Sequence, residues 1–121
     1  MKRYNKDIGK YGEALAYDYL IKKKYKIINK NFQNRYGEID IIAIKNFVIH
    51  FIEVKCRYNK DYGFALDAVN FYKQMKIKKL AKYFINSFNL YQYNIQFDVC
   101  EVYLNYYNDN FRINFIENAF A

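Results

Sequence analysis

The sequence contains no proline and no tryptophan, and it has only four glycines, two cysteines and one histidine. The scarcity of proline and glycine excludes a linker-rich, collagen-like or multi-module chain. The 121 residues suffice for one hydrophobic core, so we expect a single domain spanning residues 1–121. Hydrophobic residues make up 53% of the chain and charged residues 26%, which is typical of a folded globular protein rather than a disordered one.

The few cysteines and the lone histidine exclude further classes of protein. Cys56 and Cys100 match no zinc-ligand spacing, and His50 cannot complete a zinc site with them. Two cysteines are also fewer than small secreted disulfide scaffolds contain. The N-terminal segment has no apolar run behind its charges, and no run approaches the roughly 18 residues of a membrane helix. We therefore expect a reduced, cytoplasmic protein that does not associate with membranes.

Acidic residues are few relative to basic ones. The chain has 20 Lys and Arg against 12 Asp and Glu, which gives a formal net charge of +8. A small domain this basic attracts polyanions, with nucleic acid first and an acidic membrane surface second. The alternative is that the charge merely keeps the protein soluble.

Hydrophobic periodicity predicts two helices and five strands. The helices are expected over residues 7–24 and 66–88, and the strands over 25–32, 39–44, 47–54, 94–104 and 111–116. Apolar residues fall on both faces of the two middle strands. Ile39, Ile41, Val48, Ile52 and Val54 are expected on one face, and Ile42, Ile44, Ile49 and Phe51 on the other. Helices should therefore cover both faces of a mixed sheet in an α/β or α+β fold.

The strands over 39–44 and 47–54 form a predicted hairpin around Lys45–Asn46. If the loop has an even number of residues centred there, Glu38 faces Glu53 and Asp40 becomes the diagonal neighbour of Glu53. Opposed residues and residues two apart share a face, so the side chains of Glu38, Asp40, Glu53 and Lys55 should gather on one side of the sheet. An odd-numbered loop would put Asp40 on the other face.

Asp40 and Glu53 indicate divalent-metal chemistry. Burying unpaired carboxylates is costly and neighbouring carboxylates repel, whereas Mg²⁺ (or Mn²⁺) takes oxygen ligands and removes the repulsion. A bound metal lowers the pKa of its water and stabilises charge on a phosphoryl oxygen, and Lys55 can orient or deprotonate the attacking water. The arrangement predicts phosphodiester hydrolysis. The alternative is that Glu53 and Lys55 end a strand in solvent while Asp40 caps a turn.

Other charged residues are candidates for supporting roles. Glu13 lies on the close-packing side of the first helix, and it either points toward the sheet or is an exposed glutamate. Arg57 and Lys73 either reach phosphate or lie on the surface, with the Lys73 stem along the apolar stripe. The second expected helix is rich in lysine and includes Lys76. Its lysines either contact the phosphates of a nucleic acid or, as is more common for such a series of charges, form a solvent-exposed face. Asp98 either supports the site or pairs with a buried cation.

Six motifs follow one another in a specific order along the chain. They are Gly9-x-x-Gly12-Glu13-x-x-Ala16-x-x-Tyr19-Leu20, Gly37-Glu38-Ile39-Asp40-Ile41-Ile42-Ala43, Phe51-Ile52-Glu53-Val54-Lys55-x-Arg57, Val69-x-x-x-Lys73-Gln74, Phe97-Asp98-Val99 and Ile116-x-Asn118-Ala119-Phe120. In this order they resemble the YraN-like family of small uncharacterised bacterial proteins. That family is similar to the restriction-endonuclease-like nuclease superfamily, and within it to archaeal Holliday-junction resolvases.

The resemblance implies a restriction-endonuclease-like αβββαβ core, with a mixed sheet flanked by helices on both faces. It also implies that Asp40, Glu53 and Lys55 are the acidic–acidic–lysine signature of these nucleases. Glu13 would then be a further metal ligand from the first helix.

The expected function is therefore that of a Mg²⁺-dependent (or Mn²⁺-dependent) endodeoxyribonuclease acting on branched or Holliday-junction-like DNA. Junction cutting needs two coordinated incisions and predicts a symmetric homodimer. We expect no small-molecule cofactor. One alternative is a nucleic-acid-binding protein of nuclease-like fold that does not cut, and another is a protein-interaction factor that uses the aromatic surface. Phosphate contacts carry no base information, so base preference stays open.

Overall fold

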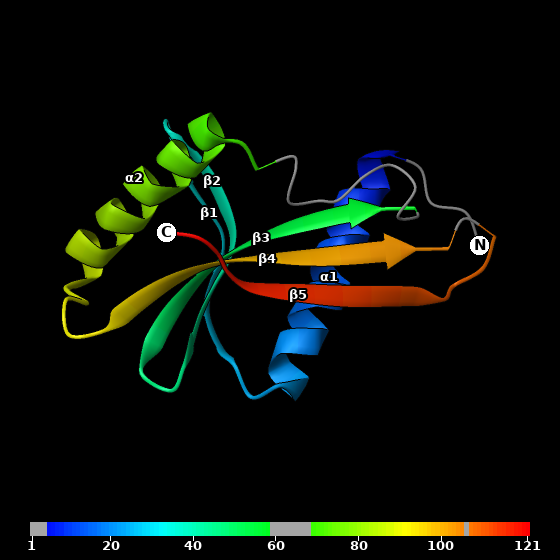
Figure 1. Ribbon diagram of the computed structural model, residues 1–121, viewed down its shortest axis with the longest axis horizontal. Coiled ribbons are helices and arrows are strands. Elements are labelled where there is room, and N and C mark those ends of the chain that lie inside the picture. The colour runs from blue at the N-terminus through cyan, green and yellow to red at the C-terminus, as the bar shows by residue number, and fades with distance from the viewer. Residues whose placement is uncertain (1–4, 59–68, 106) are drawn as a thin grey trace.

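Two helices pack against a five-stranded sheet in the computed structural model, which describes residues 5–58, 69–105 and 107–121 (Figure 1). The elements are α1 (Asn5–Lys22), β1 (Lys26–Asn34), β2 (Gly37–Lys45), β3 (Val48–Arg57), α2 (Phe71–Phe88), β4 (Asn94–Leu104) and β5 (Phe111–Phe120). The first six follow the expected αβββαβ order, and β5 adds a fifth strand. The fold is α/β and is compatible with a restriction-endonuclease-like core.

The element boundaries agree closely with the periodicity, with two clear differences. The strand predicted over 94–104 coincides with β4, whereas β5 continues to Phe120, beyond its predicted end at residue 116. The second helix begins at Phe71 rather than near residue 66, because the Asn70 side chain accepts a hydrogen bond of 2.9 Å from the Lys73 backbone N–H and caps the helix. Residues 59–68, which contain the predicted start of this helix, lie outside the described residues.

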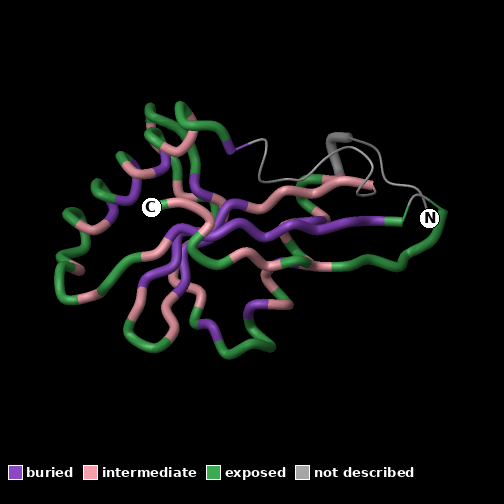
Figure 2. The backbone as a smooth tube through the Cα atoms, in the orientation of Figure 1, coloured by how far each residue is buried: buried purple, intermediate pink, exposed green. Residues whose placement is uncertain are grey.

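The sheet is mixed, and its strands lie in the order β1-β2-β3-β4-β5. β3 and β4 are parallel, and the other neighbouring pairs are antiparallel. The parallel pair requires a crossover connection, which contains α2. β4 is buried continuously over residues 97–104, as the central tube in Figure 2 shows. This strand is therefore the most continuously buried element of the sheet.

Two separate apolar cores lie on opposite faces of the sheet, so helices cover both faces as expected. On one face, Ile42 and Phe51 pack with residues of α2. On the opposite face, Ile41 and Ile52 pack with residues of α1. Ile39 belongs to the α2-side core although Ile41, two residues later, belongs to the other. The expectation that these two pack on the same face is therefore wrong. The pairing of β2 with β3 ends at Ile41, so Ile39 lies beyond the part of β2 that pairs with β3.

Each helix presents one apolar stripe to the sheet. The buried residues of α2 are Ile77, Leu80, Ala81 and Phe84, whereas its other side is rich in lysine. Within the described part of the chain, no helix combines the length and the apolar character needed to cross a membrane.

Candidate active site

The β2–β3 hairpin has an even-numbered loop, but its register differs from the expected one. The two loop residues are Asn46–Phe47, and Lys45 pairs with Val48 on either side of them. Both loop residues have positive φ, of 53° and 65°, as the tight two-residue hairpin turn requires. The loop therefore lies one residue further along the chain than predicted. The loop is still even-numbered, and Asp40 and Glu53, which lie just beyond the last paired residues of the two strands, line one pocket.

β2 and β3 cease to pair just beyond Ile41 and Ile52. In a continued register Asp40 would lie directly opposite Glu53, not diagonally as predicted. Instead, the Asp40 carboxylate accepts a hydrogen bond of 2.8 Å from the backbone N–H of Val54. The side chain satisfies a donor that the neighbouring strand leaves unpaired, which holds the carboxylate at the point where the two strands separate.

A pocket of about 330 Å³ opens at this point. Its lining residues come from α1, β2, β3 and α2, and they are Gly9, Glu13, Glu38, Asp40, Glu53, Val54, Lys55, Cys56 and Lys73. The fold thus brings together five of the candidates from the sequence, namely Glu13, Asp40, Glu53, Lys55 and Lys73. Arg57 and Lys76 do not line this pocket.

Asp40 is the most strongly perturbed acid of the pocket. Burial, followed by the charge of Glu53, raises its pKa to about 8, although the Val54 N–H acts in the opposite direction. Without a cation, this carboxyl therefore carries a proton over much of the neutral pH range. A cation placed between the two acids would favour the ionised form.

The two lysines of the pocket form a linked pair. Lys73 Nζ lies 2.9 Å from Glu53 Oε2, and the Glu53 side chain is buried. Burial and the contact with Lys73 lower the pKa of Lys55 to about 8. Burial also acts to lower the pKa of Lys73, but its contacts with Lys55 and Glu53 outweigh this and raise it. Of the two amines, Lys55 is therefore the one that loses its proton more readily, whereas Lys73 stays charged.

Glu13 points toward the site from α1 and is half-buried, so it is not an ordinary exposed glutamate. α1 can approach β3 closely because residue 12 is glycine: a Cβ there would lie 2.6 Å from the Cys56 Cβ. Burial and the charge of Glu38 raise the pKa of Glu13. The Asn31 amide, oriented so that its nitrogen faces both acids, donates to Glu38 Oε2 at 3.1 Å and to Glu13 Oε1 at 3.0 Å.

The acids suit a hard divalent cation but do not enclose one. Among residues 5–58, 69–105 and 107–121, no group of three or more His, Cys, Asp or Glu side chains is placed so that it could hold a metal ion. Mg²⁺ commonly keeps several waters and needs only one or two protein carboxylates. Asp40 and Glu53 could supply these two, provided that Lys73 shares or releases Glu53.

The remaining candidates lie outside the pocket. Arg57 ends β3, and its buried Nε has no hydrogen-bond partner in the described part of the chain. Lys76 is exposed on α2, with its Nζ 4.7 Å from the centre of the Tyr72 ring. Asp98 pairs with His50, with 2.6 Å between Oδ2 and Nδ1. Of the two roles considered for Asp98, the structure thus supports a buried pair rather than support of the pocket.

The sequence analysis did not single out Glu101. It is buried on β4, directly beside Lys55 in the parallel register, and its Oε1 accepts a hydrogen bond of 2.7 Å from Asn114 Nδ2. The signal that could have found it is the one used for Asp98, an acidic residue within an otherwise apolar strand.

Comparison with known proteins places the chain in a family. The model of the uncharacterised protein family UPF0102 matches residues 12–102. A UPF0102 protein of Clostridium botulinum (strain Alaska E43 / Type E3) is 52% identical over 120 residues, which cover 99% of this chain and 98% of that protein. UPF0102 proteins of Clostridium beijerinckii and Clostridium tetani are 51% and 47% identical, each with the same two coverages. The chain therefore belongs to the UPF0102 family, the YraN-like family that its motifs resemble.

Proposed function

We propose that this protein is a divalent-metal-dependent nuclease that hydrolyses phosphodiester bonds in DNA. The observation that carries the proposal is the gathering of Asp40, Glu53 and Lys55 at one pocket where β2 and β3 separate. Two carboxylates and one amine of lowered pKa are the groups that metal-assisted phosphodiester hydrolysis needs. The resemblance to junction resolvases favours branched or Holliday-junction-like DNA as the substrate.

Asp40 and Glu53 would hold Mg²⁺ or Mn²⁺. Glu13 lines the same pocket from α1 but does not complete a three-acid metal site with them, so it would become a further ligand only by moving toward the ion. When bound, the ion supplies a water of lowered pKa and stabilises charge that develops on a phosphoryl oxygen. The raised pKa of Asp40, caused first by burial and then by the charge of Glu53, supports this assignment, because a positive ion between the two acids would favour their ionised forms.

Lys55 is the proposed general base or water-orienting group. Its lowered pKa leaves a substantial neutral fraction near pH 8, so that its amine can accept a proton from the attacking water. Lys73 stays charged beside it and can contact a phosphate oxygen or the carboxylate of Glu53. Most of the rate enhancement would then come from placement and charge stabilisation.

The net charge of +8 supports a polyanionic substrate. Lys73 and Lys76 both line the hollow beside the pocket, and Arg57 ends β3, the strand that carries Glu53 and Lys55. Incision of both strands of a junction would require two copies of the site, which is the reason to propose a symmetric homodimer.

One observation favours a second candidate function. Lys73 already places a positive charge 2.9 Å from Glu53, where the proposed metal would otherwise neutralise that carboxylate. A lysine that permanently replaced the metal would leave a nucleic-acid-binding protein that does not cut.

Cleavage of matched DNA substrates separates the two functions. Wild type, Asp40→Asn and Lys55→Ala are incubated with duplex, single-stranded and four-way-junction DNA in Mg²⁺ or Mn²⁺. The nuclease proposal predicts cleavage by wild type that both variants lose and that EDTA stops. Binding of the same DNA without any metal-dependent cleavage would favour the second function. Cleavage that survives in both variants would contradict the assigned site.

A further inference from the structure

A second groove of about 340 Å³ continues from the carboxylate pocket toward α2. Glu38 and Lys73 line both hollows, so the groove lies directly beside the pocket. Tyr36, Tyr72 and Lys76 also line the groove. We refer to Tyr36, Tyr72, Lys73 and Lys76 as the tyrosine–lysine groove.

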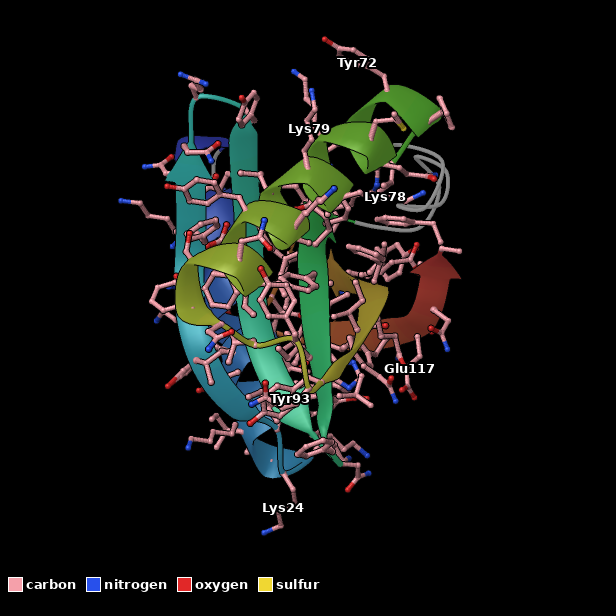
Figure 3. All side chains as sticks on the ribbon, turned by 90° about the vertical axis from the view of Figure 1, so that its left-hand side faces the viewer. Lys24, Tyr72, Lys78, Lys79, Tyr93 and Glu117 are labelled. Carbon is pink, nitrogen blue, oxygen red and sulfur yellow. The ribbon has the colours of Figure 1, made fainter. Side chains whose placement is uncertain are left out.

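The two tyrosine rings of this groove are accessible and each lies beside a cation. Tyr72 is 70% exposed and Tyr36 is 37% exposed. Lys76 Nζ lies 4.7 Å from the centre of the Tyr72 ring. Arg35 Cζ and Lys79 Nζ lie 5.1 Å and 5.3 Å from the centre of the Tyr36 ring, and Arg35 Nη2 donates a hydrogen bond of 3.0 Å to the Tyr36 hydroxyl. Figure 3 shows Tyr72 and Lys79 projecting from α2 in the same direction at one end of the molecule.

Aromatic faces beside lysines fit single-stranded nucleic acid better than duplex. Bases in a duplex are already stacked and paired, so a duplex offers the groove its phosphates only. An unpaired base can stack on a tyrosine ring while a lysine contacts the adjacent phosphate, and proteins that bind single strands use this combination. A cation over an exposed ring is held more weakly than a stacked base, so Lys76 and Lys79 can move from the rings to phosphates when a base arrives.

The tyrosine–lysine groove also lies close to the proposed metal-binding acids. Tyr36 precedes Asp40 by four residues, mostly along β2, which spans roughly 13 Å at the usual strand rise. That distance corresponds to about four stacked nucleotides, or fewer in an extended strand. A base on Tyr36 would therefore lie within a few nucleotides of the phosphate in the pocket.

We propose that the tyrosine–lysine groove binds an unpaired DNA strand next to the cleavage site, with a base stacked on Tyr36 or Tyr72. The substrate would then be DNA in which a duplex adjoins a single-stranded segment, rather than an uninterrupted duplex. This inference rests on the proposed nuclease function and specifies the class of its substrate.

Binding measurements test the groove separately from cleavage. All variants for binding carry Asp40→Asn, so that Mg²⁺ can be present without cutting. The fluorescent probes are a blunt duplex, the same duplex with a single-stranded extension, and that extension with abasic sites in place of its bases. We expect the extension to strengthen binding and the abasic sites to remove the gain. Tyr36→Ala and Tyr72→Ala should each lower affinity for the intact extension by about fivefold or more, as the loss of one stacked base does.

Two controls isolate the stacking contribution. Tyr36→Phe keeps the ring and should keep the affinity. Tyr91→Ala removes a tyrosine that is 65% exposed but does not line the groove, and it should leave affinity unchanged. Equal binding of intact and abasic extensions, or tyrosine variants no weaker than Tyr91→Ala, would overturn the inference. If native Asp40 protein still cuts DNA in that case, the nuclease proposal stands alone, whereas absence of both binding and cleavage removes both proposals.

Discussion

The Asp40 carboxylate accepts its hydrogen bond from the backbone N–H of Val54, across the point where β2 and β3 stop pairing. This contact fixes one acid of the pocket at the opening between the strands. Burial and the neighbouring Glu53 raise its pKa to about 8, so the protein holds this acid in an unfavourable electrostatic environment. Such perturbed groups are typical of functional sites, and they make the site testable by titration.

The raised pKa of Asp40 predicts a pH-dependent stability. The unfolded chain ionises this carboxyl near pH 4, whereas the folded protein keeps it protonated up to about pH 8. Its contribution to stability is therefore complete below the unfolded pKa and is lost as the pH rises through the folded pKa. Between about pH 6 and pH 9, wild type should lose about 2 kcal/mol of unfolding free energy relative to Asp40→Asn.

Urea unfolding of both proteins without metal measures this difference. Asp18→Asn, at an exposed position on α1, serves as the control and should follow wild type. Parallel stability curves for wild type and Asp40→Asn across this pH range would show that the acid is not buried in the charged environment described above.

Metal binding should oppose this effect and release protons. A divalent cation between Asp40 and Glu53 favours the ionised form of Asp40, so apparent affinity for Mg²⁺ or Mn²⁺ should rise between about pH 6 and pH 8. Isothermal titration in two buffers of different ionisation enthalpy counts the protons released. Asp40→Asn should lose both the proton release and most of the affinity. Binding that is independent of pH and unchanged in the variant would place the ion elsewhere.

The two glycines of α1 should respond oppositely to alanine. A Cβ on Gly12 would lie 2.6 Å from the Cys56 Cβ, whereas a Cβ on Gly9 meets nothing within 4 Å. Gly12→Ala should therefore cost about 1–3 kcal/mol through overpacking between α1 and β3. Gly9→Ala should be neutral or should stabilise the helix by up to about 1 kcal/mol.

Chemical denaturation of the two variants gives the comparison directly. Because Gly12 sets how closely α1 approaches β3, its variant should also weaken metal binding by displacing Glu13. Equal stabilities of the two alanine variants would mean that the close approach is not a constraint.

We expect the His50–Asp98 pair to contribute to the free energy of unfolding and not to metal binding in the pocket. Both side chains are buried, and Asp98 Oδ1 also accepts from Gln96 Nε2 and from the Asn118 N–H, each at 2.9 Å. Asp98→Ala should cost about 3 kcal/mol or more, since it leaves buried donors without an acceptor.

Folded Asp98→Ala, studied at low temperature, should still bind metal like wild type. His50→Ala should show the same separation. Loss of metal affinity in protein that retains native circular dichroism would instead connect this pair to the site.

The sequence predicted the helices, the strands and the convergence of the acids for identifiable reasons. The 3.6-residue and two-residue periodicities located every described element, and the even-numbered hairpin loop predicted that Asp40 and Glu53 would come together, as they do at one pocket. The exact register was not predictable, because neither Asn46 nor Phe47 is glycine although both have positive φ. The packing of Ile39 on the other face accompanies the end of β2–β3 pairing at Ile41, a point that no residue type signals.

Contacts between elements that are distant along the chain could not be predicted from the sequence. The pairing of Lys73 with Glu53 depends on how α2 lies over the sheet, and the position of Glu101 beside Lys55 depends on the β3–β4 register. Asn31, which bridges Glu13 and Glu38, is one of many asparagines in the chain and carries no signal by itself.

The central claim is that Asp40 and Glu53 hold a divalent cation at the opening between β2 and β3. An anomalous difference map from crystals soaked in Mn²⁺ tests it most directly, with Asp40→Asn crystals as the control. The account predicts one strong peak coordinated by both carboxylates in wild type, with Lys73 displaced from Glu53, and no peak in the variant. A pocket without a peak at saturating Mn²⁺, with Lys73 still bound to Glu53, would contradict it.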